Sequence, residues 1–257
     1  MNFIDKFRWF YCINLLSIPV GVIVAFQTSL YWLLFTFFWY RFVGIIFVSI
    51  GLHRYFAHRS FKTGPLRHKM FAIGSILSGT GSPIAFASQH THHHKHSDKE
   101  SDLHSPRDGA FHSCFSWLLN SKQWFFEEKG MIVPMFAVKD RFVNFVHKHY
   151  FIIWFLISFS LFLIDWKLFL FMMPMTAGLC ILTSNVVGVY IAHTKLPGSY
   201  KNFDTKDNSY NNKFVQFLET AEGYHNNHHA DPSNYNFARK SGEFDACAWI
   251  IERFFKI

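Results

Sequence analysis

Histidine is the residue type whose number and spacing in this sequence could do chemistry. The chain holds 16 histidines in 257 residues, and most of them fall in three clusters. The clusters are HRYFAH at 53–58, HTHHH at 90–94 and HNNHH at 225–229. Imidazole is the commonest metal ligand among side chains and suits iron, zinc, copper and nickel. The clusters therefore indicate a metal site.

The spacing within each cluster predicts how the rings are arranged. In the second and third clusters, histidines at positions i, i+3 and i+4 lie within about 100° of one helix face and can converge on a common centre. In the first cluster, His53 and His58 lie about 140° apart on an α-helix, so we expect them to flank a site. The clusters supply eight such histidines, too many for one ion and suitable for two. Packing alone seldom produces three spaced clusters.

The elements that position these clusters belong to a membrane protein. Half of the residues are apolar, a fifth are aromatic and only 16% are charged, against about 25% in a typical soluble domain. We predict an all-α integral membrane protein that forms a single domain over residues 1–257. A span needs about 20 apolar residues, and four stretches come near this length: about 9–26, 30–52, 150–164 and 168–192.

Two apolar regions leave alternatives open. The stretch 150–164 is short for a span unless residues 142–149 extend it as a helix. The stretch 70–87 is rich in glycine and serine. It could be a fifth span, a re-entrant segment or a helix on the membrane surface, and we favour the last two.

Charge predicts the orientation of the chain. With four spans, segments 1–8, 53–148 and 193–257 lie on one side and carry 23 of the 25 Lys and Arg. The positive-inside rule places both termini, and a helical cap formed by 53–148 and 193–257, in the cytosol. Arg41 lies inside the second span and is a functional candidate. Alternatively, its side chain reaches the interface or its helix extends beyond the membrane.

The clusters resemble those of the membrane-bound fatty acid desaturases, specifically the acyl-CoA Δ9-desaturase-like branch. The segments HRYFAHRSF at 53–61, HTHHHKHSD at 90–98 and EGYHNNHHADP at 222–232 are similar to the three histidine boxes of that family, in the same order. The resemblance extends to residues 102–106 and to NFDTKDNS at 202–209. It covers about residues 30–235.

The resemblance implies a centre of two Fe²⁺ ions held by nine histidines. The ninth ligand of the family follows its last span, which matches His193. The implied ligands are His53, His58, His90, His93, His94, His193, His225, His228 and His229. A carboxylate that accepts the outer N–H of a ligand histidine fixes its tautomer. Asp98, Asp102 and Glu222 are candidates for this role, whereas His92, His96 and His104 fall on positions that the family does not use as ligands.

The chain departs from the family pattern at Val189. The family usually has an Asn here, four residues before the ninth histidine, where it holds a water on one metal. Asn185 lies one turn further back and near the same face, since eight residues advance a helix by about 80°. We expect either a water-mediated contact from Asn185 to the metal or a different water arrangement.

The activity implied by the resemblance is O2-dependent insertion of a cis double bond, expected at Δ9, into a saturated acyl chain carried on CoA or a lipid. A lipid hydroxylase or other oxygenase on the same scaffold would share all nine histidines. A metal-binding or transport protein would place ionisable residues along its spans, yet apart from Arg41 the spans are nearly bare of charge.

The expected partners follow from what the sequence contains. It shows no cytochrome b5, flavin or dinucleotide pattern, so electrons would come from a separate ferredoxin, rubredoxin or cytochrome b5. The other partners are the acyl substrate and membrane lipids. Scattered basic residues do not favour nucleic acid. Arg54, Arg59 and Lys62 surround the first box and would contact either the substrate head group or membrane phosphates. The four cysteines form no CxxC pair and suggest neither disulfides nor a thiolate site.

Overall fold

The computed structural model describes residues 3–119, 134–219 and 221–257. Residues 120–133 of the predicted cap lie outside the described residues. Within these ranges the ordered elements are helices, and pairing between extended segments is limited to two isolated bridges, Tyr200 with Asn211 and Asn211 with Tyr224. The prediction of an all-α membrane protein is confirmed.

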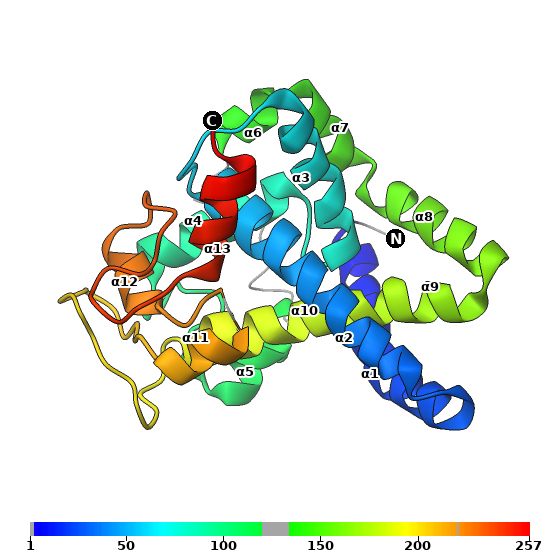
Figure 1. Ribbon diagram of the computed structural model, residues 1–257, viewed down its shortest axis with the longest axis horizontal. Coiled ribbons are helices and arrows are strands. Elements are labelled where there is room, and N and C mark those ends of the chain that lie inside the picture. Colours follow the sequence, from blue (N-terminus) through cyan, green and yellow to red (C-terminus); the bar gives the residue numbers. More distant parts are fainter. Residues whose placement is uncertain (1–2, 120–133, 220) are drawn as a thin grey trace.

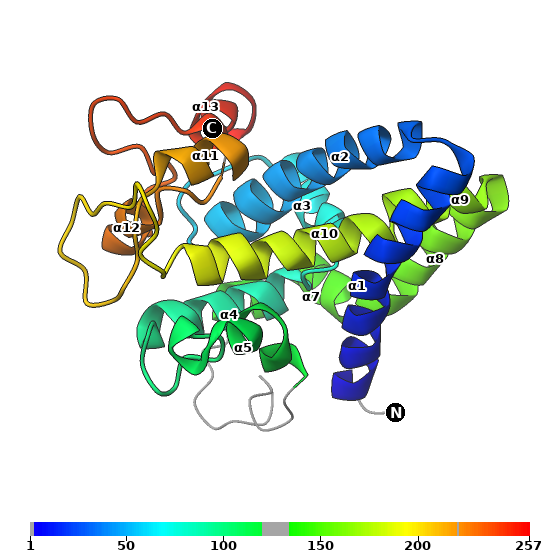
Figure 2. The ribbon, with the colours of Figure 1, turned by 90° about the horizontal axis from the view of Figure 1, so that it is seen from below.

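Three helical rods in the described residues are long and apolar enough to cross a membrane. The first is α1 (Phe3–Thr28). The second is α2 (Tyr31–Val43), which continues into the π-helical segment η1 (Gly44–Ala57). The third combines α9 (Trp166–Met172), α10 (Pro174–Asn185) and the π-helical segment η5 (Val186–Ile191). α10 packs against both α1 and α2 (Figures 1 and 2).

Large apolar side chains cover the outside of these rods. Trp9, Leu16 and Phe26 of α1 and Phe37 and Phe38 of α2 are more than half exposed. Soluble monomers rarely expose contiguous apolar surface of this extent. Lipid therefore covers this surface, and the protein is an integral membrane protein.

The third predicted span, residues 150–164, is too short to cross the membrane as a single straight helix. α8 (Tyr150–Ile164) has 15 residues, or about 22 Å at 1.5 Å per residue, which is less than the ~30 Å hydrocarbon core. Residues 142–149 do form helix, in α7 (Arg141–Lys148), but α7 bends away from α8 by 68° and does not prolong it. The described part of the chain has three candidate spans, or up to five if each bent pair counts as one. This range includes the predicted four.

The stretch 70–87 is divided between two helices. α3 (Pro65–Ser78) and α4 (Pro83–His96) meet at a bend of 80°. Gly79 ends α3 in the left-handed conformation with φ 67°, which glycine adopts without steric cost. Ser82 then accepts a hydrogen bond from the backbone N–H of Ala85 and starts α4. The sharp break fits a re-entrant segment better than a straight span, and it directs α4 toward the other histidine boxes.

The remaining described elements are short. They are η2 (Pro106–Asp108), α5 (Ala110–Cys114), η3 (Ser116–Leu118), α6 (Met135–Lys139), α11 (Lys213–Glu219), α12 (His225–Ala230), α13 (Ala246–Ile250) and η6 (Ile251–Phe255). In Figure 1, α4, α11, α12 and α13 gather at one end of the molecule, opposite the turn that joins α8 and α9. All three histidine boxes lie at this end.

A buried ion pair ties the C-terminal segment to the first box. Arg54 Nη2 lies 3.0 Å from Asp245 Oδ2, and both side chains are completely buried. The guanidinium also donates to the carbonyl of Ala221 at 3.0 Å and stacks 3.9 Å above the ring of Phe237. The expectation that Arg54 contacts a head group or membrane phosphate is therefore wrong, because this side chain is completely buried.

Arg41 is also held inside the protein. Its guanidinium forms an ion pair with Glu219 at the end of α11. The side chain therefore joins the second span to the segment just before the third box.

We expect the contact between α1 and α10 to tolerate no side chain at Gly178. A methyl group there would overlap the backbone carbonyl of Asn14 in α1. Gly178→Ala should lower the free energy of unfolding by about 1–3 kcal/mol, measured as a lower thermal midpoint in detergent. The matched control is Gly188→Ala, where no heavy atom of the described residues outside the local helix lies within 4 Å of the added carbon. Equal midpoints for the two variants would contradict the packing described here.

Candidate metal centre

The first box is presented by a wide helical turn. The backbone N–H of His58 donates to the carbonyl of His53 at 3.0 Å, the i to i+5 pattern of a π-helix. This winding brings the two side chains to one face, with ring centroids 4.9 Å apart. The expectation that they flank the site was based on α-helical geometry and is wrong. Both rings point to the same centre.

The other ligand candidates come from three elements. The second box lies on α4 and the third on α12, both helical as predicted. His193 follows η5, where the N–H of Ala192 donates to the carbonyl of Val187 in the same i to i+5 pattern. His193 is buried and faces the boxes.

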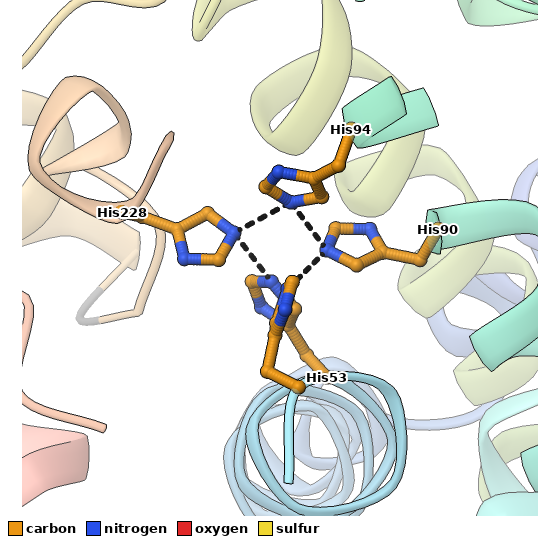
Figure 3. Close-up of side chains that lie close together, drawn as sticks. His53, His90, His94 and His228 are labelled. Atoms are coloured by element: carbon orange, nitrogen blue, oxygen red, sulfur yellow. Dashed lines mark hydrogen bonds between the residues drawn. The ribbon is translucent and has the colours of Figure 1, made fainter. Parts of the chain in front are cut away.

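Five imidazoles form a first group. The ligand atoms of this group all lie within 4.8 Å of one another, and the residues are His53, His58, His90, His94 and His228. Neighbouring Nε2 atoms are 2.7–3.0 Å apart. Figure 3 shows the rings of His53, His90, His94 and His228 directed at a common centre.

The separations in this group fit a shared metal ion. Imidazole nitrogens bind ions such as zinc at ~2.0–2.1 Å, so two nitrogens at right angles around one ion would be ~2.9 Å apart. The observed 2.7–3.0 Å agrees with this value. The same atoms could form hydrogen bonds only where one of each facing pair carries a proton.

Four imidazoles form a second group next to the first. Its members are His93, His193, His225 and His229, again with ligand atoms within 4.8 Å of one another. Nε2 of His93 and Nε2 of His229 are buried and have no hydrogen-bond partner among the described residues. Buried polar atoms are normally satisfied, so these two nitrogens suit metal coordination. The two groups together contain all nine histidines that the resemblance indicates.

Four carboxylates accept the outer Nδ1–H of ring members. Three of them were indicated by the sequence. Glu222 contacts His53 at 3.0 Å, Asp102 contacts His93 at 3.2 Å, and Asp98 contacts His193 at 2.9 Å. Each such bond leaves the Nε2 lone pair directed at the centre.

The fourth carboxylate, Asp207, was not identified from the sequence. It accepts from Nδ1 of His229 at 2.8 Å. It belongs to NFDTKDNS at 202–209. This segment is part of the resemblance, but the sequence assigned no role to its residues. Only the folded course of that loop brings Asp207 to the third box.

The charge states of these groups suit this arrangement. Burial alone would raise the pKa of Glu222, but the charge and hydrogen bond of His53 lower it to about 2. The pKa values of Asp98 and Asp102 are also lowered against the effect of burial, by His193 and His93 respectively. These carboxylates are therefore ionised at neutral pH.

The pKa values of the third-box histidines are lowered, which is the direction that metal binding requires. Burial, followed by repulsion from neighbouring imidazoles, lowers the pKa of His225, His228 and His229 well below its usual range. Neutral imidazoles keep a lone pair for a metal ion. The third box thus presents neutral imidazoles, whereas Asp102 raises the pKa of His93 against the effect of burial.

The histidines expected not to be ligands have other contacts. His92 Nε2 lies 2.8 Å from the carbonyl of Ser101, and His96 Nδ1 lies 2.7 Å from the hydroxyl of the same residue. His104 is buried beside Asp102 and packs against the ring of Trp117.

Asn185 lies near the second group, but its amide donates hydrogen bonds to groups outside that group. Its Nδ2 donates to the carbonyl of Cys114 at 3.0 Å and to the hydroxyl of Tyr11 at 3.3 Å. Asn185 and Val189 both line the cavity beside His93 and His225. A water-mediated contact from Asn185 to a metal stays a prediction.

Three cavities follow one another past the centre. The central cavity, about 90 Å³, is bounded by His53, His93 and His225. It shares Asn185 and Phe86 with a second cavity of about 50 Å³ next to α1. It shares Val48 and Glu222 with a third of about 60 Å³ between α2 and α10. Ser184 lines all three, so the cavities are neighbours, and the histidines lie at the central one.

Comparison with known proteins agrees with this geometry. Residues 28–241 match the profile of the family described as fatty acid desaturase. The chain belongs to the fatty acid desaturase family. It is an oxidoreductase enzyme, so family membership does not support a non-enzymatic metal-binding or transport protein.

Individual relatives are distant. The chain is 27% identical to the probable lipid desaturase ADS3.2 of Arabidopsis thaliana over 84% of this chain and 59% of the relative. It is 28% identical to delta-9 acyl-lipid desaturase 1 of the same plant, over 84% and 69%. It is 29% identical to stearoyl-CoA desaturase 2 of Mus musculus, over 90% and 66%. The chain thus spans about two thirds of the length of these relatives.

Removing one ring from the first group should empty the centre. We expect His228→Ala to lose bound metal and activity, because the variant leaves an open coordination position. His92→Ala in the second box should be much milder, since His92 contacts a loop carbonyl. Metal bound per chain, measured by elemental analysis, tests this. Full metal content and activity in His228→Ala would contradict the grouping.

The role of Asp207 can be separated from its loop contacts. Asp207 Oδ1 accepts from the backbone N–H of Ser209, whereas Oδ2 accepts from His229. Asp207→Asn can keep the turn but presents an amide N–H₂ to the ring. We expect metal affinity to fall about 10–100-fold, measured by competition with a chelator. Asp204→Asn, an exposed position in the same loop, is the matched control, and equal affinities would argue against the contact.

Proposed function

We propose that this enzyme is an O2-dependent desaturase that introduces a cis double bond into a saturated fatty acyl chain on CoA or a lipid. We expect the double bond at Δ9, a position that appears in the name of one acyl-lipid relative. We further propose that residues 1–257 act as one desaturase domain. The observation that carries the proposal is the meeting of nine histidines in two adjacent groups beside a series of cavities.

The proposed cofactor is a pair of Fe²⁺ ions, one in each group of imidazoles. Iron accepts imidazole ligands, and the separations of the ligand nitrogens suit coordination. Removing hydrogen from an unactivated methylene needs activation of O2, and this is the chemistry that the bound iron would supply. The carboxylates Glu222, Asp98, Asp102 and Asp207 would hold four rings in the tautomer that directs Nε2 inward.

The proposed path of the acyl chain is the series of three cavities. The central cavity would hold the bond to be oxidised next to the histidines. Phe86, Val48 and Val189 contribute apolar wall at this point. An apolar wall around the reacting carbons excludes water and limits side reactions.

The proposed orientation places the cap, the centre and both termini in the cytosol, as the positive-inside rule indicates. The three boxes share one site, so they lie on one side of the membrane. Electrons would come from a separate ferredoxin, rubredoxin or cytochrome b5 that approaches from the cytosol.

Hydroxylation on the same scaffold is the nearest alternative. It would use the same nine histidines, so the geometry of the ligands does not separate the two reactions. Only the product does.

The proposal is tested by expression in a host that lacks unsaturated fatty acids. Mass spectrometry of the total acyl chains then locates any double bond. We expect a cis-monounsaturated product that the His228→Ala variant does not form. A hydroxylated product would support the alternative, and the absence of any product from an iron-loaded protein supplied with a reduced donor would contradict the proposal.

A further inference from the structure

The corner formed by α3, α6 and α7 lies beside α8. α7 packs against α3, α4, α6 and α8, and Figure 1 shows α3, α6 and α7 together at one edge of the molecule. α8 begins directly after α7 and leaves Ile152, Phe155 and Phe159 about half exposed. Apolar side chains exposed along a helix of this kind face lipid. The corner therefore adjoins the point where the lipid-covered surface of α8 begins.

Positive charge gathers on this corner. Six Lys and Arg side chains from α3, α6, α7 and the segment before α3 are exposed: Arg59, Arg67, Lys69, Lys139, Arg141 and Lys148. Two of them lie over aromatic rings of neighbouring elements. The guanidinium of Arg59 is 4.7 Å from the ring centre of Phe136, and Nζ of Lys69 is 5.5 Å from that of Phe142. Cations from separate segments of the chain thus share one surface, which we call the basic corner.

The fold supplies almost no negative charge to the basic corner. Residues 58–78 and 134–149 contain one acidic residue, Asp140. Its Oδ1 accepts from two backbone N–H groups at the start of α7, and its Oδ2 lies 3.2 Å from Nε2 of His68. Within the described residues, none of the six cations forms an ion pair with a carboxylate. The corner therefore keeps a net positive charge for a partner outside the chain.

α7 has the pattern of a helix that lies at the depth of lipid phosphates. Arg141, Phe145 and Lys148 are exposed and lie on one face, since positions i, i+4 and i+7 align on a helix. Val143 and Val146 face the protein and are buried. α7 is bent from α8 by 68°, so it runs closer to the membrane plane where α8 enters lipid. Its exposed face places an aromatic ring between two cations at the membrane surface.

We propose that the basic corner binds the head groups of anionic phospholipids and that this lipid stabilises the packing of α7. Clusters of about four to eight Lys and Arg next to a membrane-inserted helix bind such head groups. A phosphodiester contacted from both α3 and α7 lowers the repulsion between their cations. Because α7 also packs against α4, which carries the second histidine box, the lipid supports a helix of the metal centre. This inference goes beyond the proposed reaction and does not depend on it.

The test uses the full chain purified in a neutral detergent. Dioleoyl phosphatidylglycerol is added as the anionic probe and dioleoyl phosphatidylcholine as the zwitterionic one, and the thermal midpoint is measured. We expect phosphatidylglycerol to raise the midpoint by about 5–10 °C at a concentration about 100 times its Kd, and phosphatidylcholine to leave it unchanged. Added salt should reduce the shift, because ions screen exposed charges.

Matched variants decide whether the basic corner is the binding surface. Arg67→Gln/Lys69→Gln/Lys148→Gln removes three of its charges and should abolish most of the shift. The control, Lys95→Gln/Lys99→Gln/Lys206→Gln, removes three exposed charges outside the corner and should keep the shift.

Two further variants separate lost lipid binding from a damaged fold. Lys69→Arg/Lys148→Arg retains the charge and should respond as the wild type does. If the triple variant of the corner does not fold, Arg141→Gln, at an exposed position of α7, should still give a smaller shift than the wild type.

Three results would overturn the proposal. The first is an equal shift in the wild type and the corner variants. The second is an equal loss in the control, because the response would then follow net charge alone. The third comes from adding free coenzyme A in place of lipid. If coenzyme A produces the same shift and the corner variant loses it, the surface recognises the head group of a substrate and not a membrane lipid.

Discussion

The structure depends on holding nine imidazoles so that their ring nitrogens converge on two adjacent centres. Facing Nε2 atoms about 3 Å apart repel each other unless a proton or a cation lies between them. Rings in this arrangement must be fixed from behind, and Glu222, Asp98, Asp102 and Asp207 do so by accepting four of the outer N–H groups. The four carboxylates lie in loops and not on the helices that carry the rings. Much of the cap therefore serves to orient the centre.

The long helices satisfy this constraint by changing their winding near the site. η1 and η5 adopt i to i+5 hydrogen bonding where they deliver His53, His58 and His193. π-helical turns often occur at functional sites. Here the wider turn puts two residues five positions apart on one face, which an α-helix does not. The long helices thus change geometry where they approach the site.

Spacing in the sequence identified the three boxes, and three of the four carboxylates were marked by their place beside a box. His193 was indicated only by the resemblance to the desaturases, because a single histidine carries no spacing signal. Sequence reasoning missed Asp207, whose position depends on how a loop folds back. It placed His53 and His58 on opposite flanks because it assumed α-helical winding. It left Arg54 as a candidate for surface contact, since a partner 191 residues away in sequence carries no local signal. Tertiary contacts account for Asp207 and Arg54, whereas local π-helical winding accounts for His53 and His58.

The separation of the ligands along the chain affects the biogenesis of the enzyme. His53 and His228 are 175 residues apart and touch in the first group. During synthesis the first two boxes reach the membrane while the third is still untranslated. The buried pair of Arg54 and Asp245 forms even later. The centre therefore assembles only after residues 225–229 have been synthesised, and metal capture follows the translation of the third box.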